Sequence, residues 1–114
     1  MKNCDEKLYE IAFVTTSNEE EAEKIAEYLV SNHLVACVNI ISGIKSIYIW
    51  ENNLEKDSEC LMIIKSRKDF RKQVMEKVKE LHSYDNPECI FLSITDGLKN
   101  YLNWIDKSLN VIKK

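Results

Sequence analysis

The chain has few of the residues on which several common classes of protein depend. Its 114 residues include 2 glycines and 1 proline, which excludes a collagen-like chain, a flexible linker and an enzyme with a glycine-rich phosphate loop. None of the 4 cysteines forms a C-x-x-C pair, so zinc-ribbon and thioredoxin-type sites are excluded as well. We expect Cys4, Cys37, Cys60 and Cys89 to be reduced thiols.

Long apolar runs are also missing. No run approaches the ~20 residues that a membrane-spanning helix needs. The segment from Met1 to Lys7 has no apolar signal region. These features predict a cytoplasmic protein with no membrane partner.

Positive charge is not in excess either. The chain carries 16 basic and 19 acidic residues, which give a net charge of −3 and a pI near 5.4. Such a protein gains little from binding a phosphate backbone, so we expect no nucleic-acid partner. With 45% apolar and 31% charged residues, the length suits one globular domain over residues 1–114, in which residues 1–7 form a flexible tail.

The hydrophobic pattern in the first half of the chain predicts a strand, a helix and a long hairpin. A continuous apolar run indicates a strand over 9–15, of the kind that is covered on both faces. Ser17 and Glu20 have the spacing of a capping box, and a helix follows that ends near Asn32. Two long strands then span 34–50 and 55–66, with a bulge or bend at Ser42–Gly43 and a turn at Asn52–Asn53.

The second half predicts a helix, a strand and a final helix. Ser66 or Asp69 is expected to cap the first of these helices, which presents Arg71 to water and ends around His82–Ser83. A strand over 88–95 follows, and Asp96 is expected to cap a last helix whose apolar positions run from Leu98 to Ile112. The order β-α-β-β-α-β-α predicts an α+β, ferredoxin-like βαββαβ fold with a long central hairpin and an added C-terminal helix.

The hairpin is long for so small a protein. Each arm of ~15 residues reaches about 50 Å at ~3.3 Å per residue, whereas a compact domain of this size is roughly 35 Å across. Helices of ~14 residues span only ~21 Å and cannot cover such arms, which carry Ile47, Tyr48, Ile49 and Trp50. Self-association covers this apolar surface; the alternative is that the bend at Ser42–Gly43 folds the arm back onto its own sheet.

Several segments, in the right order, resemble the CutA family of divalent-cation tolerance proteins. The resemblance covers about residues 8–110. It implies a ferredoxin-like fold related to the PII signalling proteins, a tight trimer formed through sheet edges, and a role in tolerance of divalent metals such as copper. The segments that carry it are Leu34-Val35-Ala36-Cys37-Val38-Asn39-Ile40, Ser46-x-Tyr48-x-Trp50, His82-Ser83-Tyr84-Asp85-Asn86-Pro87-Glu88 and Tyr101-Leu102-x-Trp104.

The chain departs from the family pattern at a position linked to metal binding. Some members carry a cysteine at the end of the first strand, where this chain has Thr15 and Thr16. The family's Trp-x-Gly at the hairpin tip is Trp50-Glu51-Asn52 here, and its His-Pro-Tyr-Glu is His82-Ser83-Tyr84-Asp85. Because a soft ligand is absent, we expect no obligatory cofactor and at most weak binding of a divalent cation such as Cu²⁺.

The best metal-ligand candidates are His82 and Glu88, which flank a turn. Imidazole nitrogen and carboxylate oxygen are both good donors for divalent ions, and Asp85 is a weaker third candidate. Two donors make only a weak site, so further ligands come from Asp85, Asp96, water or another subunit. The alternative is structural: His82 ends a helix and Glu88 caps the turn.

A cleft between subunits is the second candidate site. Tyrosine and tryptophan are enriched at interfaces because each keeps a polar group on a large apolar ring, although plain packing explains them too. Lys65 is expected to pair with Glu59 or Asp96, to bind an anion, or to lie solvated at a strand end. The cleft candidates are Tyr48, Trp50, Lys65, Tyr84, Asp96, Tyr101 and Trp104.

These features favour a non-enzymatic homotrimer that takes part in divalent-metal tolerance and binds a metal or small ligand weakly between subunits. A PII-like small-molecule sensor is the alternative. An acid–base enzyme that uses His82 is less favoured, because the chain has no nucleophile elbow, no H-E-x-x-H and no P-loop.

Overall fold

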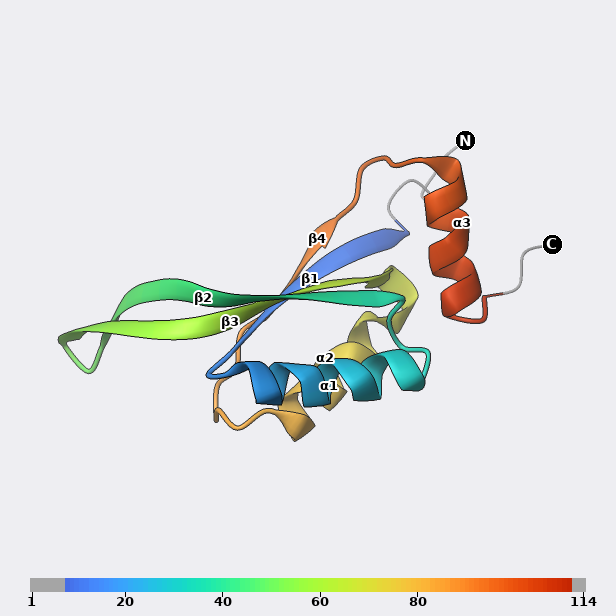
Figure 1. The fold of residues 1–114 in the computed structure, drawn as a ribbon. Coiled ribbons are helices and arrows are strands. Elements are labelled where there is room, and N and C mark those ends of the chain that lie inside the picture. The colour runs from blue at the N-terminus through green and yellow to red at the C-terminus, as the bar shows by residue number, and fades with distance from the viewer. Residues whose placement is uncertain (1–7, 112–114) are drawn as a thin grey trace.

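The computed structural model describes residues 8–111 and shows a four-stranded antiparallel sheet with the strand order β2-β3-β1-β4. Helices α1 and α2 cover one face of this sheet, and α3 lies at one end (Figure 1). This is the predicted α+β, ferredoxin-like arrangement with an added C-terminal helix. The elements are β1 (Tyr9–Thr16), α1 (Glu19–Ser31), β2 (Cys37–Trp50), β3 (Asn53–Arg67), a 3₁₀ turn (Lys68–Phe70), α2 (Arg71–Leu81), β4 (Cys89–Ser93) and α3 (Lys99–Ser108).

The main core lies between the sheet and the two helices. Strand β1 alternates strictly, so that Ala12 and Val14 are buried under the helices while Ile11 and Phe13 point to the other face and are half-buried. Within the described subunit, β1 is thus covered fully on one face only, which differs from the prediction of two covered faces. The core under α1 and α2 consists of Ala12, Val14, Ala22, Ile25, Ala26, Leu29, Val35, Cys60, Met62, Ile64, Val74 and Val78.

A bulge in the central hairpin changes which residues of β2 lie on each face of the ribbon. Strand β2 pairs Ile41 with Leu61 and then Ile44 with Glu59, so Ser42 and Gly43 together oppose a single residue of β3. Gly43 has φ +77°, a left-handed conformation that glycine adopts without strain. The predicted bulge at Ser42–Gly43 is therefore confirmed, and the alternation of β2 shifts by one residue beyond it.

Beyond the bulge the hairpin leaves the rest of the molecule. The last pair between β1 and β3 is Thr16 with Cys60, so residues 44–59, which we call the arm, have no third strand beside them. The described residues extend 52 × 29 × 23 Å, and Figure 1 shows the arm projecting beyond both helices. Its turn lies at Glu51 and Asn52, both with positive φ, one residue earlier than predicted.

The caps of the helices differ from the predictions. Asn18, not Ser17, is the N-cap of α1, and its Oδ1 accepts the amide proton of Glu21 at 2.8 Å. No side chain caps α2, because the Ser66 hydroxyl donates to the Leu34 carbonyl and Asp69 accepts from Arg67. Asp96 accepts only from its neighbouring Gly97 amide, and Leu98 is the N-cap of α3.

Buried ion pairs fasten α2 and α3 to the sheet. Arg67 Nη1 donates to Asp106 Oδ1 at 2.6 Å, and the Tyr9 hydroxyl donates to Asp106 Oδ2 at 2.8 Å. Arg71 pairs with the buried Glu10 instead of facing only water, as the sequence pattern predicted. A small second cluster, with Ala36, Ile105 and Leu109 buried, lies under α3.

Two expectations fall partly or wholly outside the described residues. The tail at 1–7 and Ile112 at the end of the last helix are not described. Over residues 8–111, no helix is both long enough and apolar enough to cross a membrane.

Candidate functional site

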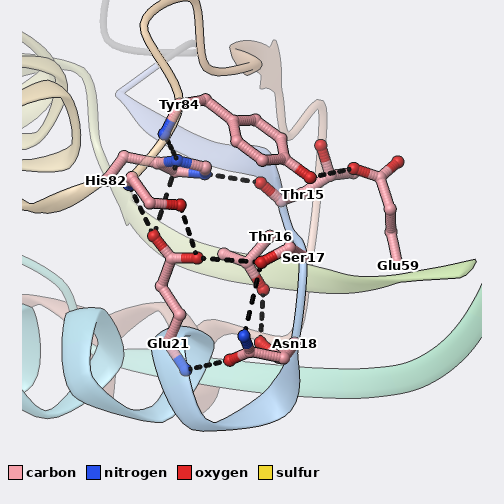
Figure 2. Close-up of polar contacts among 9 residues, drawn as sticks. Thr15, Thr16, Ser17, Asn18, Glu21, Glu59, His82 and Tyr84 are labelled. Atoms are coloured by element: carbon pink, nitrogen blue, oxygen red, sulfur yellow. Dashed lines mark hydrogen bonds and ion pairs between the residues drawn. The ribbon is translucent and has the colours of Figure 1, made fainter. Parts of the chain in front are cut away.

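His82 lies directly after α2 with its side chain fully buried against the end of β1 (Figure 2). Its Nε2 donates to the Thr15 carbonyl oxygen at 2.7 Å, and its Nδ1 accepts the amide proton of Tyr84 at 3.1 Å. These partners define the neutral tautomer that carries its proton on Nε2. Both ring nitrogens are thus committed to backbone groups, and His82 holds the loop after α2 against β1.

Glu21, in the first turn of α1, holds the next residue of the same loop. Its carboxylate accepts the Ser83 amide at 2.6 Å and the Ser83 hydroxyl at 3.1 Å. Partial burial by itself raises the pKa of Glu21, but the hydrogen bonds from Ser83 outweigh it and leave the pKa lowered. The carboxylate also lies 3.7 Å from His82 Nδ1, which makes it the carboxylate that faces the imidazole.

The pairing of His82 with Glu88 stays a prediction. The carboxylate beside His82 comes from α1 rather than from the turn at 82–88. Across residues 8–111, no three or more His, Cys, Asp or Glu side chains are grouped so as to hold a metal ion. A metal site built on His82, Glu88 or Asp85 therefore needs donors from beyond the described residues, and His82 must give up one backbone partner to join it.

Tyr84 connects this loop to the arm. Its hydroxyl donates to Glu59 Oε2 at 2.8 Å, and its ring lies 4.7 Å from the His82 ring, centroid to centroid. Burial and the hydrogen bond to the Glu59 carboxylate both raise the pKa of Tyr84. Figure 2 shows the resulting line of contacts from Thr15 through His82 and Tyr84 to Glu59.

The remaining cleft candidates lie in separate places within one subunit. Tyr48 is on the arm, where its hydroxyl donates to Asp57 and this hydrogen bond raises the pKa of Tyr48 to about 12. Lys65 donates to Asn39 on β2, so its predicted partners Glu59 and Asp96 are not the ones it contacts. The Tyr101 and Trp104 rings of α3 lie 5.5 Å apart, centroid to centroid. A single cleft that contains Tyr48, Trp50, Lys65, Tyr84, Asp96, Tyr101 and Trp104 therefore requires more than one copy of the chain.

The cysteines of the described region are free thiols. Cys37, Cys60 and Cys89 form no disulfide, and Cys4 lies outside the described residues. Burial, with the nearby Glu88 carboxylate, raises the pKa of Cys89 to about 11, so this thiol stays protonated near neutral pH.

Two residues of the site were missed by sequence reasoning. Glu21 belongs to a run of acids that suits the start of any helix, and nothing local distinguishes it from Glu19 or Glu20. Glu59 was considered only as a partner of Lys65. Both find their partners through contacts between segments 25 to 62 residues apart in the chain, which no short-range pattern reports.

The whole fold has close relatives of known family. The model of the CutA1 divalent ion tolerance protein family matches residues 10–108, a span that contains the arm, His82 and Tyr84. The divalent-cation tolerance protein CutA of Thermus thermophilus is 40% identical over 98 residues, which cover 86% of this chain and 95% of that protein. The chloroplastic protein CutA of Arabidopsis thaliana is 44% identical over 98 residues, 86% of this chain, and the chain spans about half of that relative's length, 54%.

Solved structures agree with this result. The periplasmic divalent cation tolerance protein CutA of Archaeoglobus fulgidus matches with a TM-score of 0.87 and 39% identity over 90% of this chain and 99% of that one. The structure of CutA1 from Oryza sativa matches with a TM-score of 0.87 and 40% identity over 90% of this chain and 94% of that one. The similarity extends over nearly the whole described chain.

Proposed function

Because the chain belongs to the CutA1 divalent ion tolerance family, we propose that it is a homotrimeric, non-catalytic protein of the response to divalent metal ions. In this proposal the subunits meet through the open face of the sheet and through the arms. Weak binding of a metal ion or small ligand takes place in the clefts between them.

The exposed apolar surface carries the proposal of self-association. On the arm, the side chains of Ile47, Ile49 and Leu54 are each about three-fifths exposed in the single subunit, at 59%, 63% and 62%. The open face of the sheet adds Ile41, Ile90 and Leu92, which are also large and exposed. Exposed apolar side chains in this number on a small protein are typical of an interface and invite aggregation when they are left in water.

The geometry of the arm favours a partner over self-burial. The alternative is an arm folded back onto its own sheet, which would bury Ile47, Ile49 and Leu54. These three side chains are instead exposed, along a ribbon that extends away from the body. We propose three copies because the resemblance to CutA proteins implies a trimer, and a closed, symmetric ring gives every arm a partner.

We propose that the assembled protein binds a divalent metal ion weakly. His82 and Glu88 are the proposed donors for a divalent cation such as Cu²⁺, with Asp85 as a further carboxylate and the remaining ligands from a second subunit or water. Since His82 loses a hydrogen bond when its Nδ1 binds a metal, the affinity is expected to be low.

The proposed compartment is a reducing one, such as the cytoplasm. The free thiols of Cys37, Cys60 and Cys89 support it. Relatives bear names that refer to the chloroplast and to the periplasm, so a fractionation experiment on the native cell is the test.

A charge placed on the arm tests the assembly. Leu54→Lys puts an ammonium group on an exposed apolar position, and Asn53→Lys adds the same charge one residue away at a polar position. We expect the first variant to dissociate and the second to keep the mass of the parent by light scattering. Equal masses for all three proteins would contradict the role of Leu54 in the interface.

Calorimetric titration with Cu²⁺ tests the metal assignment. The chain has two histidines, so His33→Gln is a matched control for His82→Gln. Weak binding that is lost in His82→Gln and kept in His33→Gln supports the assignment, and binding of the same strength in both variants overturns it.

A further inference from the structure

The junction between the arm and the body has little to hold it in a fixed direction. The third strand ends at the pair Thr16 with Cys60, and the bulge at Ser42–Gly43 follows at once on β2. No atom other than those of its chain neighbours lies within 4 Å of the position that a Cβ of Gly43 would take, so nothing packs against that side of Gly43. A two-stranded ribbon that continues from such a bulge is free to bend there.

One side chain reaches across this junction from another part of the molecule. The Tyr84 hydroxyl donates to Glu59 Oε2 at 2.8 Å. Glu59 pairs with Ile44, which is the first pair of the arm beyond the bulge. Tyr84 therefore contacts the arm at its base. A small change there in the angle between arm and body produces a large displacement of the tip.

The other end of Tyr84 is held by the body. Its amide donates to His82 Nδ1 at 3.1 Å, and the imidazole in turn donates to the Thr15 carbonyl at 2.7 Å, close to the end of β1. Glu21 of α1 holds Ser83 by two hydrogen bonds. Figure 2 shows that the contacts form an unbroken line from β1 and α1 to the base of the arm.

We propose that Tyr84 is a positioning residue that fixes the angle between the arm and the body, and so presents the arm to a second copy of the chain in the orientation needed for assembly. The second half of this inference rests on the proposed trimer, while the first half concerns the single subunit. The junction supplies the freedom to bend, and the hydrogen bond from the phenol to the carboxylate removes it.

The physical benefit is preorganisation. An arm that samples many angles loses that freedom when it docks, and the lost freedom weakens association. A hydrogen bond to a charged acceptor is worth a factor of roughly ten or more in an equilibrium. Removal of the Tyr84 hydroxyl is therefore expected to loosen the arm about tenfold and to favour dissociation of the trimer by about tenfold for each subunit released.

Hydrogen exchange and subunit dissociation together test the proposal. Tyr84→Phe removes the hydroxyl and keeps the ring against His82, and Tyr28→Phe, on the outer side of α1 near Lys77, is the matched control. Glu59→Gln keeps a neutral oxygen that accepts the same hydrogen bond, so it is expected to fall between the parent and Tyr84→Phe. All four full-length proteins are compared for exchange of amides in residues 44–59 and for mass on dilution.

Amide exchange tests the inference, and the mass of the parent protein tests the proposed trimer. Faster exchange of the arm amides and easier dissociation in Tyr84→Phe, with Tyr28→Phe like the parent, support the inference. Exchange in Tyr84→Phe equal to that in Tyr28→Phe overturns it, whatever the mass. If the parent is a monomer, the proposed trimer fails, and the exchange of the arm still decides whether Tyr84 holds the angle.

Discussion

Strands β2 and β3 are more buried at the end that lies in the body than at the end that forms the arm. In the body, Met62 and Ile64 of β3 are fully buried between the sheet and the helices. In the arm, Leu54 of β3 and Ile47 and Ile49 of β2 are largely exposed, although they are residues of the same kind in the same strands. The difference comes from what lies alongside: β1 ends at Thr16, and α1 and α2 do not extend over the arm. Apolar character thus predicts that a strand is covered, but not by which chain.

The largest effect that we expect is on the free energy of unfolding, and it comes from shortening a leucine side chain in the body rather than in the arm. Leu29 is fully buried under the sheet, so Leu29→Ala is expected to lower the free energy of unfolding by about 3 kcal/mol through lost burial and a residual cavity. Leu54→Ala removes the same atoms from an exposed position and is expected to leave subunit unfolding nearly unchanged while weakening assembly. Chemical denaturation over a range of protein concentrations separates subunit unfolding from dissociation, and a similar, concentration-independent loss for both variants would break the comparison.

The next effect concerns how α3 is fastened to the body. Asp106 is buried and accepts from Arg67 and Tyr9. In Asp106→Asn, Arg67 keeps only Asp69 as its charged partner, so we expect a loss of about 2 kcal/mol in the free energy of unfolding. Asp57→Asn, a charge removal on the exposed arm, is the control and is expected to cost far less. Equal losses would show that burial of the pair does not matter.

A smaller effect is expected at the boundary between the two regions. Gly43→Ala forces an alanine into a left-handed conformation, which costs about 1 kcal/mol even though its methyl group meets no atom. Ser42→Ala, the neighbouring residue of the bulge, has no such conformational penalty. Thermal unfolding measures the pair, and an unchanged midpoint for Gly43→Ala would mean that the bulge relaxes.

The smallest effect depends on pH. The hydrogen bonds from Ser83 lower the pKa of Glu21 from its ordinary value of 4.5. A carboxyl group with a lowered folded pKa stabilises the protein above the unfolded value, and this contribution is lost as the pH falls through the folded pKa. Glu21→Gln is therefore expected to be less stable than the parent at pH 7, with the difference in unfolding free energy narrowing below about pH 4.5. A gap that is constant over pH 3 to 7 would contradict this assignment.

Much of the fold follows from patterns that act over short distances. Strand alternation, the glycine in the central hairpin and the apolar stripes of the helices predicted the element order and the bulge at Ser42–Gly43. The predicted caps were wrong. Asn18 caps α1 in place of its neighbour Ser17, and no side chain caps α2 or α3, because Ser66, Asp69 and Asp96 form hydrogen bonds elsewhere. The long hairpin was predicted correctly from strand lengths alone.

The site was harder to predict for the same reason. His82 was correctly placed at the end of a helix, but its partners, the Thr15 carbonyl and the Tyr84 amide, are backbone groups that any residue type supplies. Glu10 with Arg71 and Arg67 with Asp106 are separated by 61 and 39 residues, so no local spacing joins them. Their pairing follows from the way α2 and α3 pack against the sheet.

The solution mass of the full chain tests the central claim, that the arm and the open face of the sheet are covered by further copies. The chain has a mass of 13.4 kDa. Light scattering coupled to gel filtration is predicted to give three times this mass over a wide range of concentration. A mass of a single chain, with the arm still extended, would contradict the account.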